Sequence, residues 1–113
     1  MDPRAVVDLD PVRGSEANKR RPAVIVSNDG ANSTAERLGR GVLTVAPVTS
    51  RSERVYPFQV LLPASSTGLR QDSKAQAEQV RSVAVERIGG LVGGLPPALV
   101  AAVDEALRLH LAL

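Results

Sequence analysis

The chain has 113 residues, of which 43% are hydrophobic and 23% charged, so its length and composition allow one globular domain over residues 1–113 and exclude two. It has no cysteine, which excludes disulfides, thiolate metal sites and a cysteine nucleophile, and which fits the reducing cytoplasm where we expect the protein. The net charge of +2 identifies no partner by itself, and because no apolar run approaches the roughly 20 residues that cross a bilayer, we expect no membrane contact.

Short β-branched runs in the first half of the chain predict strands separated by tight breaks. Residues 5–9 form the first run, and Pro11 follows it, where the proline ring removes a backbone donor and bends the chain. Residues 23–26 predict a buried strand, too short and too β-branched for a helix. One helical turn is expected within 32–38, before a strand over 42–48 whose two apolar faces predict a central position in the sheet.

The second half predicts further short strands. Residues 58–62 read as a strand with a proline on each side. Residues 73–80 alternate small and polar side chains, which predicts a strand next to the functional face. The glycine-rich residues 85–95 predict a last short strand or turn.

From Pro96 onward the hydrophobic period changes to three or four residues, which predicts a C-terminal helix with proline in its first turn. One apolar stripe of this helix should face the sheet, and it consists of Leu99, Val100, Val103, Leu107 and Leu111. Leu109 and Leu113 fall off the stripe, so we expect a second apolar side that contacts another copy of the chain in a homodimer. The pattern as a whole predicts a mainly β fold with a C-terminal α-helix, shaped as a small, strongly curved antiparallel barrel.

Positive charge is concentrated in residues 13–54, where eight basic and four acidic side chains give +4 and leave the rest of the chain net acidic. Such an uneven distribution is typical of a polyanion-binding face, although solvated loops are also often charged. Tyr56 and Phe58 are the only aromatic residues, too few to stack a series of bases. Any bound RNA must therefore be held mainly by Arg, Lys, Asn, Gln and backbone groups.

Three motifs stand in a fixed order along the chain: Arg13-Gly14-Ser15-Glu16, then Arg21-Pro22 with the apolar run that ends at Asn28, then Val45-Ala46-Pro47-Val48-Thr49-Ser50. In this order they resemble the MazF/PemK/Kid family of toxin endoribonucleases, and the resemblance extends from Asp8 to Leu113. It implies an SH3-like barrel that works as a homodimer, and a toxin of a type II toxin–antitoxin pair.

The resemblance also implies a reaction and partners. Members of the family cleave single-stranded RNA at a short sequence without a metal or other cofactor, leaving a 2′,3′-cyclic phosphate and a 5′-hydroxyl, and thereby arrest growth. A cognate antitoxin would bind the basic groove through an acidic segment that folds on docking. The residue content of the chain agrees with the metal-independent reaction. No Asp/Glu/His cluster has metal-ligand spacing, and the single His110 excludes a histidine-pair mechanism within one chain.

Three residues are the catalytic candidates. Arg21 stands where the basic loop meets a stiff strand, and its planar fork can bind two phosphate oxygens. The resemblance implies that Arg21 takes part in proton transfer, but a guanidinium rarely yields its proton, so charge stabilisation is the simpler role. Glu16 is either the base for the 2′-hydroxyl or a salt-bridge partner that fixes an arginine. For Thr49 the resemblance implies a catalytic or phosphate-holding hydroxyl.

Eight further residues are candidates for RNA binding, and each could equally be a solvated surface residue. The candidates for the RNA backbone are Ser15, Lys19, Arg20, Asn28, Ser50 and Arg51. Asp72 and Gln79, in a later segment that the resemblance places along the groove, could read base edges through acceptor and amide groups.

Two other functions compete with RNA cleavage. A CcdB-like gyrase poison would share the fold, but such chains rely on a C-terminal Trp-Gly-Ile, and this sequence has no tryptophan. The second competing function is that of a catalytically silent barrel that binds RNA or protein.

One departure from the family is the short segment before Asp8, which lacks the aromatic residues usual there and shortens the first strand.

Overall fold

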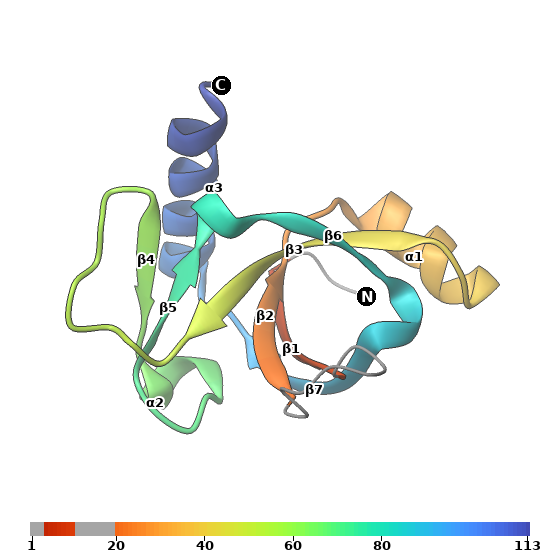
Figure 1. Ribbon diagram of the computed structural model, residues 1–113, viewed down its shortest axis with the longest axis horizontal. Coiled ribbons are helices and arrows are strands. Elements are labelled where there is room, and N and C mark those ends of the chain that lie inside the picture. Colours follow the sequence, from red (N-terminus) through yellow and green to blue (C-terminus); the bar gives the residue numbers. More distant parts are fainter. Residues whose placement is uncertain (1–3, 11–19) are drawn as a thin grey trace.

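The computed structural model describes residues 4–10 and 20–113 (Figure 1). The strands are β1 (Ala5–Leu9), β2 (Arg21–Ile25), β3 (Val42–Thr49), β4 (Gln59–Leu62), β5 (Ser73–Gln76), β6 (Arg81–Ala84) and β7 (Ile88–Gly94). The α-helices are α1 (Asp29–Leu38), α2 (Ala64–Thr67) and α3 (Pro97–Leu111), and two single 3-10 turns are η1 (Ala77–Gln79) and η2 (Val85–Arg87).

One antiparallel sheet contains all of these strands, in the order β4-β5-β3-β2-β1-β7, with β6 paired to β3. The long strand β3 is central, as predicted: it pairs with β2 on one side, and on the other side with β6 along Val42–Val45 and with β5 at Val48 and Thr49. The sheet curves strongly around a core (Figure 1). The pairings of the described residues do not close it, so it is barrel-like and open. A mainly β fold with a C-terminal helix is confirmed.

Two apolar clusters fill the two faces of this curved sheet. Val7 and Ile25 belong to the cluster inside the curve, whereas Val6 and Val24 belong to the cluster between the sheet and α3. Successive residues of β1 and β2 therefore point to opposite faces and are buried on both, which accounts for the apolar runs Ala5–Val7 and Ala23–Ile25. Each fully buried valine contributes on the order of 2 kcal/mol of transfer free energy.

The first helix is longer than predicted. A single turn was expected within 32–38, but α1 runs over ten residues from Asp29. The Asn28 side chain caps it by accepting a hydrogen bond from the Ala31 N–H at 2.8 Å, and Gly39 ends it with a φ of 65°. The sequence does not reveal this helix, because Gly30 and its polar neighbours have poor helix propensity. The Asn28 cap, the hydrogen bonds of the buried Asn32 with Ser27 and the burial of Ala35 stabilise it.

The predicted strand over 73–80 is wrong in its second half. Strand β5 ends at Gln76, and the turn η1 redirects the chain into β6, which pairs with the first half of β3. The expected short element within 85–95 is a seven-residue strand, β7, that covers β1. The small residues of β6 and β7 give little local strand signal, because these strands form by pairing with a neighbouring strand rather than by local propensity.

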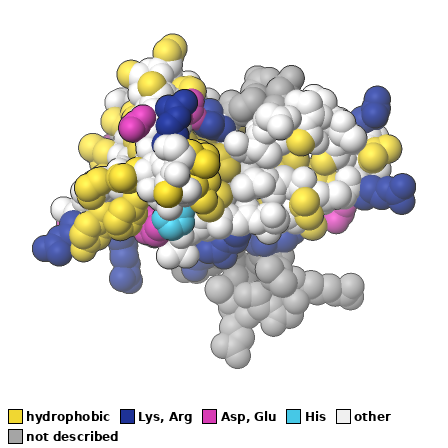
Figure 2. All heavy atoms as spheres, turned by 90° about the horizontal axis from the view of Figure 1, so that it is seen from above, with side chains coloured by type: hydrophobic (Ala, Val, Ile, Leu, Met, Phe, Trp, Pro, Cys, Tyr) yellow, Lys and Arg dark blue, Asp and Glu magenta, His cyan; other side chains and the backbone are white. Residues whose placement is uncertain are grey.

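The C-terminal helix is confirmed, but its buried stripe differs. Val103 and Ala106 are buried, with Leu99, Ala102 and Leu107 packed beside them, whereas Leu111 is 49% exposed. Leu109 and Leu113 are 56% and 85% exposed, as expected for residues off the stripe. Figure 2 shows hydrophobic side chains gathered over the part of the surface that α3 forms.

Candidate active-site groove

A groove of about 590 Å³ opens where β2 begins and β3 ends. The strands β1, β2, β3 and β7 and the segment between α2 and β5 all contribute to its wall. The lining residues are Asp8, Arg20, Arg21, Pro22, Val48, Thr49, Ser50, Gly68, Leu69, Arg70, Gln71, Ser73 and Val92.

Arg21 and Thr49 lie on neighbouring antiparallel strands and line the same groove. The β2–β3 ladder ends at the pair Ala23 and Pro47, two residues after Arg21 and two residues before Thr49. Sequence positions 28 residues apart therefore contribute to one groove.

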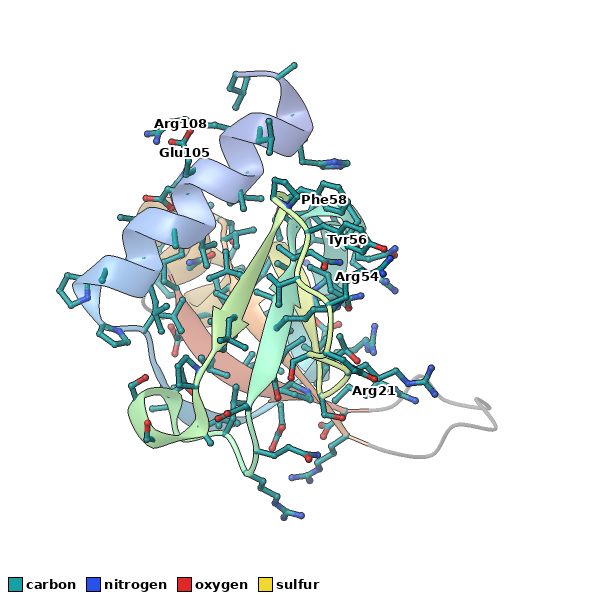
Figure 3. The ribbon with its side chains drawn as sticks, turned by 90° about the vertical axis from the view of Figure 1, so that its left-hand side faces the viewer. Arg21, Arg54, Tyr56, Phe58, Glu105 and Arg108 are labelled. Atoms are coloured by element: carbon teal, nitrogen blue, oxygen red, sulfur yellow. The ribbon has the colours of Figure 1, made fainter. Side chains whose placement is uncertain are left out.

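The Arg21 guanidinium is available for a ligand. Arg21 is exposed, and within the described ranges it makes no recorded side-chain hydrogen bond or ion pair. In Figure 3 its side chain extends away from the body of the protein. Pro22 follows it and pairs with Asp8 on β1, so the backbone at the base of this side chain is fixed by ring and ladder together.

The Thr49 hydroxyl is held in place by the backbone. Its Oγ1 accepts a hydrogen bond from the Arg51 N–H at 3.2 Å. A hydroxyl that accepts from a backbone N–H still has its own proton to donate. Thr49 can therefore donate to a phosphate oxygen from a half-buried position at the end of β3.

The groove is positively charged. Among the described residues, Arg20, Arg21 and Arg70 line it together with one carboxylate, Asp8. Arg20 also forms an ion pair with Asp10 at 3.2 Å, but at 64% side-chain exposure this contact is screened by water and leaves the guanidinium accessible. Three arginines with one acid produce a potential that attracts a phosphodiester.

The structure brings together Arg20, Arg21, Thr49 and Ser50 from among the sequence candidates. Arg51 is exposed directly after them. Asp72 lies between two lining residues, and its carboxylate accepts a hydrogen bond from the Ala64 N–H at 2.8 Å rather than lining the groove.

Two of the sequence candidates lie outside the groove, and three belong to the part of the chain that the structure does not describe. Asn28 stands beyond the far end of β2, on the order of 20 Å along the chain from Arg21, where it caps α1. Gln79 lies in η1, exposed and outside the groove wall. Ser15, Glu16 and Lys19 lie outside the described residues.

The sequence analysis placed the segment that includes Asp72 along the groove, but it missed the neighbouring wall residues Gly68, Leu69, Arg70 and Gln71. This segment reaches the groove because Gly68, at a φ of 82°, packs directly on β7: a Cβ there would come within 2.5 Å of the Val92 carbonyl oxygen. The polar run Arg70-Gln71-Asp72-Ser73 between two apolar stretches was the available signal. Apart from Asp72, its residues were not assigned to the site because they are distant in sequence from Arg21.

Among the described residues no group of three His, Cys, Asp or Glu side chains could hold a metal ion. His110 is exposed near the end of α3 and does not line the groove. No helix in the described part of the chain is long and apolar enough to cross a membrane.

Residues 5–111 match the model of the PemK-like, MazF-like toxin family of type II toxin–antitoxin systems. The chain belongs to this family. It is 66% identical over 105 residues to the endoribonuclease MazF9 of Mycobacterium tuberculosis, covering 93% of this chain and 89% of that one. It is 32% identical over 107 residues to the endoribonuclease EndoA of Bacillus subtilis, covering 94% and 88%.

Solved structures of MazF toxins have the same fold. A MazF of Deinococcus radiodurans superposes with a TM-score of 0.73 at 30% identity, covering 100% of this chain and 97% of that one. A mycobacterial endoribonuclease, solved in complex with its cognate antitoxin, superposes with a TM-score of 0.79 over 100% and 96% of the two chains. The identity in that pair is 19%, so this likeness concerns the fold alone. The predicted family is confirmed.

Proposed function

We propose that this toxin is an endoribonuclease that cleaves single-stranded RNA, at a short sequence, in the groove lined by Arg21 and Thr49. Its relatives at 66% and 32% identity, matched over most of both chains, are endoribonucleases. The observation that carries the site assignment is that Arg21, which makes no side-chain hydrogen bond or ion pair within the described residues, lines one groove with a backbone-held Thr49. A scissile phosphate bound there contacts both side chains.

The reaction is a transesterification that needs no metal. The 2′-oxygen forms a bond to phosphorus and the bond from phosphorus to the 5′-oxygen breaks, giving a 2′,3′-cyclic phosphate and a 5′-hydroxyl. The Arg21 guanidinium neutralises the nonbridging oxygens as negative charge develops, and the Thr49 hydroxyl donates a further hydrogen bond to them. The Thr49 hydroxyl is held before the substrate binds, and the β1–β2 ladder fixes the backbone from which the Arg21 side chain extends.

Two proton transfers accompany this step. A base accepts the proton of the 2′-hydroxyl, and an acid protonates the departing 5′-oxygen. Glu16 is the base suggested by the sequence, and Asp8 is a second carboxylate that lines the groove. Arg21 is the family-implied participant in proton transfer, and charge stabilisation remains the role that its chemistry favours.

The same groove is the proposed binding site of a cognate antitoxin. A mycobacterial relative and the MazF of Deinococcus radiodurans were each solved with their antitoxins. An acidic antitoxin segment would compete with RNA for Arg20, Arg21 and Arg70, and its degradation would release the toxin and arrest growth. We further propose that the protein is cytoplasmic and acts as a homodimer through the exposed leucines of α3.

Incubating the purified protein with a long RNA in the presence of EDTA tests the proposed function. We expect cleavage at one short sequence, with a cyclic phosphate on the upstream end and a hydroxyl on the downstream end. Cleavage that EDTA abolishes would exclude the metal-independent mechanism. Absence of cleavage, together with inhibition of DNA gyrase, would favour the CcdB-like alternative, and absence of both would favour a silent binding barrel.

A further inference from the structure

Two glycines from distant parts of the chain bring the α2 segment and β7 into direct backbone contact. A Cβ on Gly68, which follows α2, would lie 2.5 Å from the carbonyl oxygen of Val92. A Cβ on Gly93 of β7 would lie 2.2 Å from the carbonyl oxygen of Thr67. Real Cβ atoms essentially never come within 3.0 Å of such an atom, so a side chain at either position would force the two segments apart. We call Gly68 and Gly93 the glycine contact.

Gly93 is required for space and not for backbone conformation. Gly68 has a φ of 82°, in the left-handed region that favours glycine, whereas Gly93 lies outside that region. Gly90 and Gly94 on the same strand also lie outside it. Among the described residues, a Cβ on either of these two would meet no heavy atom within 4 Å beyond its chain neighbours. Strand β7 therefore has one glycine that the contact requires and two that have room for a side chain.

The glycine contact lies at the groove. Gly68 and the three residues that follow it line the groove, and so does Val92, the residue before Gly93. We call residues 68–71 the groove wall. Arg70 in this wall is exposed, and among the described residues its side chain makes no hydrogen bond or ion pair. The backbone position of the groove wall, rather than a side-chain contact, therefore decides where the charge of Arg70 lies.

Hydrogen bonds within the segment join the groove wall to α2. The buried Thr67 hydroxyl donates to the Pro63 carbonyl oxygen at 2.8 Å and accepts from the Leu69 N–H at 3.4 Å. The Asp72 carboxylate accepts from the Ala64 N–H at 2.8 Å, which links the two ends of the segment. Because these bonds tie the segment together, a displacement at the glycine contact moves the groove wall as a unit.

We propose that Gly93 is a positioning residue for RNA cleavage. Because it lacks a side chain, the groove wall packs directly on β7, and this packing places Arg70 against a phosphate next to the one that reacts. This inference rests on the proposed function. A phosphate away from the reacting bond is bound equally in the ground state and in the transition state, so weakening its contact raises KM and leaves kcat unchanged. Gly93 itself touches no substrate and acts through the groove wall.

The kinetics of RNA cleavage test the proposal with a matched pair of variants. Gly93→Ala should raise KM roughly 10-fold, the effect of losing one charge-assisted contact, and should leave kcat unchanged. Gly94→Ala adds the same methyl group at the next residue, where there is room for it, and should have the KM of the wild type. Equal KM values for the two folded variants would overturn the proposal, and so would a fall in kcat without a rise in KM.

Arg70→Gln shows whether Gly93 acts through Arg70. This change alone should raise KM by a similar factor, and combining it with Gly93→Ala should add nothing further, since both remove the same contact. Multiplied effects in the double variant would contradict the proposal, because the glycine contact would then support some other group. The salt dependence of RNA binding is a second readout: each single variant should flatten the slope of log K against log salt by about 0.7, the value for one phosphate.

Thermal melting checks the fold of each variant. If Gly93→Ala does not fold, Thr67→Val decides, because it removes the two hydrogen bonds of the Thr67 hydroxyl and loosens the groove wall while the glycine contact keeps its shape. We expect this variant to have a raised KM and an unchanged kcat. A wild-type KM for Thr67→Val would overturn the proposal.

Binding of a labelled single-stranded 2′-O-methyl RNA, followed by anisotropy, separates this inference from the proposed function, because the blocked hydroxyl prevents cleavage. Weaker binding by Gly93→Ala than by Gly94→Ala supports the inference even if the wild-type protein cleaves no RNA. Equal binding by the two variants of a protein that does cleave RNA refutes the inference and leaves the proposed function standing. A wild-type protein that binds no such RNA overturns both.

Discussion

Arg21 at the start of β2 and Thr49 at the end of β3 line the same groove, because these two antiparallel strands pair through Ala23 and Pro47. Both residues belong to strands rather than to loops. A site built on paired strands holds its groups more rigidly than one built on loops, which suits a reaction that depends on placing charge against a phosphate.

Arg21→Ala should lower the rate of RNA cleavage by ~10²–10³, because one preorganised charge-stabilising donor is removed from the transition state. The exposed Arg21 side chain makes no recorded contact among the described residues, so we expect an unchanged melting temperature. The measurement is cleavage of a fluorogenic RNA, with Arg37→Ala on α1 as the matched control. Wild-type activity in a folded Arg21→Ala protein would refute the assignment.

Thr49→Val keeps the shape of the side chain and removes the hydroxyl. Loss of a hydrogen bond to a charged oxygen should slow cleavage roughly 10–100-fold. Thr34→Val is the control, since the Thr34 hydroxyl bonds the Gly30 carbonyl oxygen on α1, away from the groove. If both variants cleave equally well, the Thr49 hydroxyl has no part in the reaction.

Binding of an uncleavable single-stranded RNA should weaken steeply as salt is added. The logarithm of the binding constant should fall against the logarithm of the salt concentration with a slope of about −0.7 for each phosphate neutralised. Replacing Arg20 and Arg70 by glutamine should flatten the slope by about 1.4 and weaken all sequences alike. The same double variant should bind an acidic antitoxin segment less tightly. Arg37 and Arg40, changed together, serve as the control. An affinity nearly independent of salt would place the RNA elsewhere.

The protein should be a dimer at micromolar concentration, because Leu109 on α3 and Leu113 just after it are exposed beside further apolar side chains. Changing both to glutamate should produce a monomer by light scattering. Leu91→Glu, on β7, is a control at a side chain that is 75% exposed. A monomeric wild-type protein would contradict the expected homodimer.

Asn28→Ala should reduce the unfolding free energy by about 1 kcal/mol and the melting temperature by about 4 °C, because α1 loses its N-cap. Asn28→Asp retains a capping oxygen and should restore the melting temperature. Calorimetry measures both. Cleavage by the stable Asn28→Asp protein then decides whether this side chain also contacts RNA, since a helix cap alone leaves the activity unchanged.

The sequence determined the elements whose pattern is local. Unbroken β-branched runs in β1, β2 and β3 predicted buried strands, the three-to-four-residue period predicted α3, and the Arg21-Pro22 and Pro47-Val48-Thr49 motifs indicated both the family and two groups of the site. These features are readable because side-chain periodicity and proline chemistry act within a few residues.

Tertiary structure decided what depends on contacts between distant segments. The close packing of Gly68 on Val92 brings Arg70 into the groove, and the strand register places Lys74 beside Thr49 and near the Tyr56 ring. None of these pairs is close in sequence or marked by a local pattern. Their geometry arises only when the sheet curves and its strands pair, because backbone hydrogen bonds and burial then fix which distant residues meet.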